Sequence, residues 1–194
     1  FSFQDRVRAG VIASKLEIVR WLQEANTQSK PILGICNGCQ ILAEAGLVPD
    51  QEGQQQIEMA LAPNMTQDQR IGFICDWVYV TIQNPQHSLF TSAFKDQMFL
   101  PIPINHGEGC FIFSDSFNTE KNVTMFQYCD RNGTVSLDFP VNPNGSTNNV
   151  AGISNSKGNV LAMMPHPERA TFLKQIPEWI HNEWSKTKQA HNTE

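Results

Sequence analysis

Residues 30–42 read KPILGICNGCQIL, an apolar run that changes into a helical pattern at a cysteine. Residues 30–35 predict a buried strand, and the apolar spacing of residues 37–45 predicts a helix that stops at Gly46. Upstream, between Val11 and Glu24, apolar residues recur at three- to four-residue steps, which predicts another helix. Helices that alternate with buried strands indicate an α/β protein with parallel strands.

Cys36 lies between the expected strand and the expected helix, in a Gly-x-Cys-x-Gly pattern over residues 34–38. This is the cysteine form of a nucleophile elbow, a strained turn that pushes the reactive side chain outward. We expect glycine on both sides because strand and helix pass too closely there for a Cβ. The helix N-terminus favours the thiolate, and the N–H of Asn37 points to where an oxyanion would form.

Two other interpretations of the same residues remain open. A free cysteine in a turn is commonly a buried structural residue. Cys36 and Cys39 also form a C-x-x-C pair, as in thioredoxin-like redox proteins or half of a zinc site. No second Cys/His pair completes a zinc site, and a redox pair has no need of glycines around its first cysteine.

A cysteine nucleophile needs a base, and the base needs a group that orients it. The segment MPHPER, residues 164–169, directly follows an expected strand at 160–164. In an extended His-x-Glu segment the two side chains share one side of the backbone. We therefore expect Glu168 to hold the imidazole of His166 with one nitrogen available to the thiol of Cys36.

The remaining pattern predicts more strands and two loops. Strands are expected at residues 73–82, 99–104, 110–113, 125–129, 136–139 and 150–154, with a turn at Asn132-Gly133. Residues 51–69 are polar and predict a loop with a short helical piece. The sequence PNGS at 143–146 predicts a surface loop.

The chain has 194 residues, of which 40% are apolar and 17% are charged, and its formal net charge is −5. This composition is typical of an ordinary soluble globular protein. The absence of a basic block argues against nucleic acid as a partner, and the absence of an 18-residue apolar run argues against a membrane partner. Five scattered cysteines are a poor disulfide framework. Free thiols in a reducing cytoplasm are therefore expected.

Taken together, the motifs resemble those of the class I, triad-type glutamine amidotransferases. GICNGCQ at 34–40 and MMPHPER at 163–169 carry this likeness. Three further segments narrow it to the glutaminase components of phosphoribosylformylglycinamidine synthase: FSFQDRVRAG at 1–10, HGEG at 106–109 and PNGS at 143–146. The likeness covers nearly the whole chain, so it implies one glutaminase domain over residues 1–194.

The resemblance implies a flavodoxin-like three-layer fold, with a mostly parallel central sheet and additional antiparallel strands. It makes Cys36 the nucleophile, His166 the base and acid, and Glu168 the orienting residue. It places Gln40 and the segment His106, Gly107 and Glu108 in the glutamine pocket. His106 invites assignment as a base, but the family uses the other histidine.

The reaction implied is hydrolysis of glutamine to glutamate and ammonia, with no metal or cofactor in this domain. The ammonia would pass to a large synthetase subunit, which uses ATP and magnesium to convert formylglycinamide ribonucleotide to its amidine. A small bridging subunit is a further expected partner. The alternative within this class is that the chain is the C-terminal domain of a long single-chain synthase. A catalytically dead regulatory subunit is a third possibility, which the intact triad disfavours.

The family pattern also has several dozen residues before the position of Phe1, including a first strand and a Gly-Gly loop. A backbone N–H of that loop supplies the second oxyanion donor. On this interpretation the chain is N-terminally truncated and lacks a strand and half of its oxyanion hole. Loss of one such donor costs roughly 10²–10³ in rate, so we expect the 194-residue chain alone to be poorly active.

Overall fold

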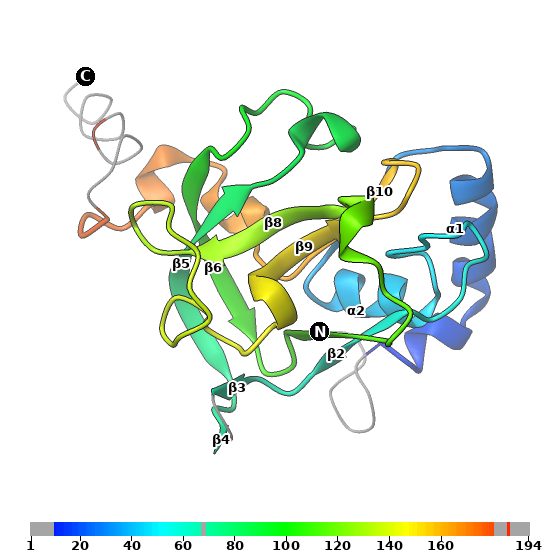
Figure 1. Ribbon diagram of the computed structural model, residues 1–194, viewed down its shortest axis with the longest axis horizontal. Helices are drawn as coiled ribbons and strands as arrows, with labels where there is room; N and C mark the ends of the chain where they lie inside the picture. Colours follow the sequence, from blue (N-terminus) through cyan, green and yellow to red (C-terminus); the bar gives the residue numbers. More distant parts are fainter. Residues whose placement is uncertain (1–9, 67–68, 181–185, 187–194) are drawn as a thin grey trace.

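A computed structural model describes residues 10–66, 69–180 and 186, and Figure 1 shows the arrangement of the elements. Residues 1–9, which carry part of the family resemblance, lie outside the described residues. A six-stranded sheet occupies the centre. In spatial order its strands are β1 (Ile32–Ile35), β10 (Val160–Met163), β9 (Val150–Ser154), β8 (Thr124–Cys129), β5 (Ile74–Ile82) and β6 (Phe99–His106).

The remaining elements are two helices, two small sheets and several 3-10 turns. The helices are α1 (Glu17–Thr27) and α2 (Asn37–Glu44). The small sheets pair β2 (Met59–Ala62) with β7 (Cys110–Phe113), and β3 (Met65–Thr66) with β4 (Gln69–Arg70). The 3-10 turns are η1 (Ala13–Lys15), η2 (Pro85–His87), η3 (Thr119–Lys121), η4 (Thr147–Asn149), η5 (Pro167–Ala170) and η6 (Leu173–Gln175).

The helix–strand–helix unit around Cys36 is confirmed, with one shift at its start. The first helix begins at Glu17 rather than Val11, because residues 13–15 form a 3-10 turn and Leu16 is extended, with φ −77° and ψ 152°. Gly46 ends the second helix as expected. Its φ of +68° is the left-handed conformation that glycine adopts readily after a helix.

The α/β fold class is confirmed, and the central sheet is mixed. Among the described strands of this sheet, β1 and β10 form the one parallel pair, and the four other pairings in the sheet are antiparallel. The described part of the sheet therefore has fewer parallel pairings than expected. Parallel neighbours need a long crossover, usually a helix. Between residues 74 and 163, all described, the connections contain 3-10 turns but no α-helix.

Two local predictions of secondary structure are wrong, and one segment predicted on the surface is mostly buried. Residues 136–139 form bends and a turn rather than a strand, and the stretch 51–66 contains β2 and β3 instead of a helical piece. The PNGS segment at 143–146 is mostly buried: Asn144 is fully buried and Ser146 is 1% exposed. Its polar side chains bind buried backbone groups, which is why turn-forming residues occur inside the protein.

Strand β10 divides the core into two layers. Val160 and Ala162 pack with α1 and α2 on one side, whereas Leu161 and Met163 pack with β5, β6 and β8 on the other. This alternation follows from the two-residue period of a strand. No helix in the described residues is long and apolar enough to span a membrane.

The sheet curls so that its two outer strands approach each other. Strands β1 and β6 stand at opposite ends of the strand order. Yet the Sγ atom of Cys36, directly after β1, lies 3.6 Å from the carbonyl oxygen of Asn105 in β6. The N–H of His166, which follows β10, donates to the carbonyl of Pro103 in β6 at 2.8 Å. The curl therefore gathers the ends of three strands at one place.

Candidate active site

Cys36 occupies a sharp turn between β1 and α2. Its φ of 51° and ψ of −106° lie outside the ordinary regions for a residue with a side chain, so the expected backbone strain is present. The N–H of Cys36 donates to the carbonyl of Met163 at 2.8 Å and continues the β1–β10 pairing by one residue. The side chain is 5% exposed. The local sequence thus places a thiol at the start of a helix.

The two glycines beside Cys36 differ in their surroundings. A Cβ on Gly34 would lie 2.4 Å from Cδ1 of Leu42 and 2.7 Å from the carbonyl oxygen of Gly38, so close passage of strand and helix is confirmed there. A Cβ on Gly38 would meet none of the described atoms within 4 Å. The steric explanation is therefore wrong for Gly38, because that part of the first turn of α2 faces open space.

Asn37 and Gln40 connect α2 to the HGEG segment at 106–109. Asn37 is the first residue of α2, where a backbone N–H has no acceptor within the helix. Its side-chain amide donates to Oε1 of Gln40 at 2.9 Å. Nε2 of Gln40 donates in turn to the carbonyl of Glu108 at 2.7 Å. The amide of Gln40 thus bonds to the chain itself, and its contact with substrate stays a prediction.

His166 and Glu168 meet just after β10, the strand that pairs with the one before Cys36. Nδ1 of His166 lies 2.6 Å from Oε1 of Glu168. The expected extended segment is instead the start of η5: His166 has φ −108° and ψ 80°, and Glu168 lies inside the 3-10 turn. A carboxylate only accepts, so Nδ1 carries the hydrogen. Nε2 of His166 is buried and has no hydrogen-bond partner among the described residues.

Parallel pairing explains why Cys36 and His166 come together from distant parts of the chain. Ile35 pairs with Met163, so Cys36 and the segment 164–168 both follow the carboxyl ends of adjacent parallel strands. In open α/β sheets this edge is where ligands bind. Strand β6 completes the arrangement through the carbonyls of Pro103 and Asn105.

His106 lies deeper, within a hydrogen-bond network centred on Asn64. Oδ1 of Asn64 lies 3.1 Å from Nδ1 of His106 and accepts from the N–H of Gly109 at 3.0 Å. Burial lowers the pKa of His106 to about 4, and the nearby His166 acts in the same direction. A Cβ on Gly109 would lie 2.3 Å from the ring of His106, so only glycine leaves the ring in place.

Sequence reasoning missed two residues that position this loop, Asn64 and Asn144. Nδ2 of Asn144 donates to the carbonyl of Gly109 at 2.8 Å, and Oγ of Ser146 approaches the same carbonyl at 3.3 Å. The turn-like composition of 143–146 concealed the burial of Asn144. Asn64 follows the apolar residues 59–62 and belongs to no recognisable motif, so nothing in the sequence marked it.

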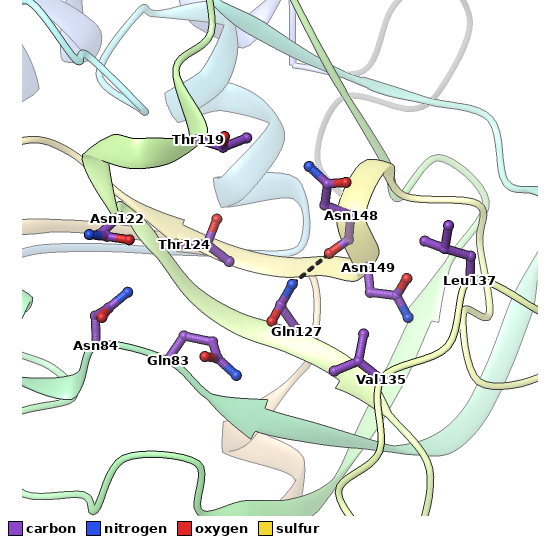
Figure 2. Close-up of a pocket in the computed structure, with 10 residues that line it drawn as sticks. All are labelled: Gln83, Asn84, Thr119, Asn122, Thr124, Gln127, Val135, Leu137, Asn148 and Asn149. Atoms are coloured by element: carbon purple, nitrogen blue, oxygen red, sulfur yellow. Dashed lines mark hydrogen bonds between the residues drawn. The ribbon is translucent and has the colours of Figure 1, made fainter.

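The predicted site residues are not among those that line the main cavities in the described part of the chain. Figure 2 shows one of about 380 Å³, lined mainly by carboxamides from the ends of β5 and β8 and from η4. This cavity lies near the Ile82 end of β5. The candidate site lies near the other end of that strand, where His106 pairs with Ile74. Within the described residues, no group of three or more His, Cys, Asp or Glu side chains is arranged to hold a metal ion.

An elbow cysteine and a carboxylate-bound histidine at the ends of adjacent parallel strands are typical of cysteine-dependent acyl-transfer enzymes of the α/β class. The family model described as the CobB/CobQ-like glutamine amidotransferase domain matches residues 1–193, and the chain belongs to this family.

Several relatives carry the name of one particular protein rather than of the whole family, and they are similar to this chain over most of its length. The phosphoribosylformylglycinamidine synthase subunit PurQ of Methanothrix thermoacetophila is 45% identical, over 91% of this chain and 70% of that protein. The subunit of the same name from Pyrococcus furiosus is 40% identical, over 94% of this chain and 78% of its own. The solved structure of PurLQS from Thermotoga maritima matches with a TM-score of 0.69 and 32% identity, over 100% of this chain and 76% of that one.

Proposed function

We propose that this chain hydrolyses glutamine to glutamate and ammonia with Cys36 as nucleophile, His166 as base and acid, and Glu168 as orienting carboxylate. The observation that carries the proposal is the pairing of His166 with Glu168 at 2.6 Å beside the strained elbow of Cys36. Membership of the glutamine amidotransferase family supplies the substrate class.

The geometry supports a two-stage reaction. Nε2 of His166 takes the proton of the Cys36 thiol, and the thiolate attacks the carboxamide carbon of glutamine. The N–H of Asn37 stabilises the oxyanion. Imidazolium then protonates the amide nitrogen, the C–N bond breaks, and ammonia leaves a thioester. Water, deprotonated by the same imidazole, hydrolyses the thioester to glutamate and restores the thiol.

The ammonia serves a synthetase that makes formylglycinamidine ribonucleotide from formylglycinamide ribonucleotide in purine biosynthesis. Support comes from relatives named phosphoribosylformylglycinamidine synthase subunit PurQ and from the PurLQS structure. We assign ATP and magnesium to that synthetase and include a small bridging subunit among the partners. We place the protein in the cytoplasm, consistent with five cysteines that are free in the structure.

A thiol redox function receives no support from the second cysteine. Cys39 is fully buried in the core beside α2, and burial, followed by the nearby Cys36, raises the pKa of its thiol well above the usual value. A resolving cysteine has to be reached and ionised. Cys39 therefore acts as a core residue in this proposal.

The test compares Cys36→Ser with Cys39→Ser in the full protein, assembled with its synthetase. We expect Cys36→Ser to abolish synthesis driven by glutamine and to leave synthesis driven by added ammonium intact. Cys39→Ser serves as the control at a neighbouring thiol and retains glutamine-driven synthesis. Equal loss in the two variants would support paired thiols, and retained glutaminase activity in Cys36→Ser would refute the proposal.

A further inference from the structure

A large cavity, separate from the one in Figure 2, lies along one face of β5. Its volume is about 810 Å³, within the roughly 300–1,000 Å³ that is usual for small-molecule sites. Trp77 and Tyr79 of β5 line it, on the face of the strand opposite to the core residue Val80. Further lining residues come from the segment 130–143 and from Trp179. The cavity is thus formed jointly by the sheet and by the loop that follows β8.

Aromatic rings are prominent in the lining of this cavity. Besides the two rings of β5, those of Phe73, Phe139 and Trp179 line it, and these three side chains are 56–61% exposed. Large apolar side chains that gather at one place on a surface mark an interaction site. Several rings around one cavity offer faces on which a planar ring system can stack.

Three charged side chains line the cavity, and they differ in the partners they already have. Oδ1 of Asp130 accepts from two backbone N–H groups of the following turn, both at 2.8 Å. Oδ1 of Asp76 accepts from the N–H of Trp77 at 2.7 Å. Arg131 forms no ion pair with another described residue. The cavity therefore offers an anionic ligand one guanidinium that no carboxylate holds.

Arg131 lies close to the hydroxyl of Tyr79. Tyr79 pairs with Cys129 across β5 and β8, and Arg131 follows Cys129 by two residues. Burial raises the pKa of the Tyr79 hydroxyl, and the nearby guanidinium of Arg131 partly offsets this rise. Guanidinium N–H groups and a phenol O–H are hydrogen-bond donors, and the oxygens of a phosphate accept from such groups. One point of an otherwise aromatic cavity thus suits a phosphate.

We propose that this cavity binds a nucleoside monophosphate, with its base against the ring of Trp77 and its phosphate at Arg131 and Tyr79. The rings select a flat base, and the guanidinium selects an anionic group beside it. Two carboxylates against one guanidinium disfavour the higher charge of a triphosphate. Among the described residues that line the cavity, none belongs to the candidate active site, so this binding site is additional to it.

The test is calorimetric titration of the full protein with adenosine 5′-monophosphate, adenosine and ribose 5-phosphate. We expect the monophosphate to bind at one site per chain, with a Kd below about 1 mM and about tenfold tighter than adenosine. Ribose 5-phosphate, which lacks the base, shows no binding at the same concentrations. Added salt weakens the binding of the monophosphate and not that of adenosine, because salt screens the contact with the phosphate.

Two substitutions separate the contribution of the charge from that of the ring. Arg131→Gln removes the cation at an exposed position, so the monophosphate falls to the affinity of adenosine while adenosine itself is unaffected. Trp77→Leu removes a ring and weakens both ligands about tenfold. Arg20→Gln and Trp21→Leu are the matched controls on α1, outside this cavity, and they leave all affinities unchanged.

Three outcomes would overturn the inference. They are no binding of the monophosphate to the wild type, equal affinities of the wild type for the monophosphate and adenosine, and an unchanged affinity for the monophosphate in Arg131→Gln. The first is also the result expected if the cavity receives a partner protein instead. If Trp77→Leu does not fold, Trp179→Leu, at a 59% exposed ring, replaces it with the same expected loss. Cys36→Ser should bind the monophosphate normally, so this inference and the proposed function are tested separately.

Discussion

Nε2 of Gln40 donates to the carbonyl of Glu108 at 2.7 Å, so the first turn of α2 is tied to the loop that follows β6. The other end of the same amide accepts from Asn37 at 2.9 Å. Gln40, which is 4% exposed, thereby links the helix that follows Cys36 to the segment that carries His106.

Replacement of Gln40 by leucine would leave the Glu108 carbonyl and the Asn37 amide without these bonds in a buried place. We expect a loss of about 1–3 kcal/mol in the free energy of unfolding and a higher KM for glutamine. Urea unfolding measures the first and steady-state kinetics the second. Gln28→Leu, at an exposed amide, is the control. A change below about 0.5 kcal/mol in Gln40→Leu would show that the link is dispensable.

Glu168→Gln separates catalysis from folding. The side chain of Glu168 is 52% exposed, so its ion pair with His166 is screened by water and we expect the free energy of unfolding to change by less than about 0.5 kcal/mol. The neutral amide no longer stabilises the imidazolium, so kcat should fall at least about tenfold with little change in KM. Glu178→Gln is the matched exposed control. Unaltered kcat would remove Glu168 from the triad.

Glycine substitutions beside Cys36 should differ in effect. Gly34→Ala places a Cβ 2.4 Å from Leu42, and we expect it to destabilise the protein by about 1–3 kcal/mol. Gly38→Ala places a Cβ in open space within a helix, where alanine is favoured, so stability should hold or rise by up to about 1 kcal/mol. Thermal unfolding of the pair checks both. Equal destabilisation by the two substitutions would contradict the difference in packing around Gly34 and Gly38.

Acid should weaken the fold through His106. Its pKa is about 4 when folded, below the ordinary value of 6.5, because burial and His166 disfavour the charged ring. The unfolded chain therefore binds the proton more readily. Stability is fully present above pH 6.5 and falls as the pH drops towards 4, by an amount on the order of 3 kcal/mol. Urea unfolding between pH 7 and pH 4 measures this slope. His106→Gln should flatten it, and an equal slope in that variant would assign the effect elsewhere.

Much of the site was predictable because its signals are local. The Gly-x-Cys-x-Gly turn and the His-x-Glu pair each lie within five residues, and the strand ahead of each is marked by an apolar run. No local sequence signal predicts whether the other strands pair parallel or antiparallel. Their direction depends on connections that lack helices, which sequence periodicity alone does not reveal.

Residues that act through burial were harder to predict. Asn144 and Ser146 have the composition of an exposed turn, yet they bind the Gly109 carbonyl in the interior. Asn64 contacts His106, Gly109 and Gly72, yet it belongs to no recognisable motif. Such roles are set by long-range packing, and a single sequence carries no separate mark for them.

Two backbone carbonyls of β6 give Cys36 and His166 one common support. Asn105 contacts the thiol of Cys36 and Pro103 holds the backbone of His166. A displacement of this strand carries both segments together and preserves their separation. The relative position of Cys36 and His166 therefore depends on one strand rather than on two separate attachments.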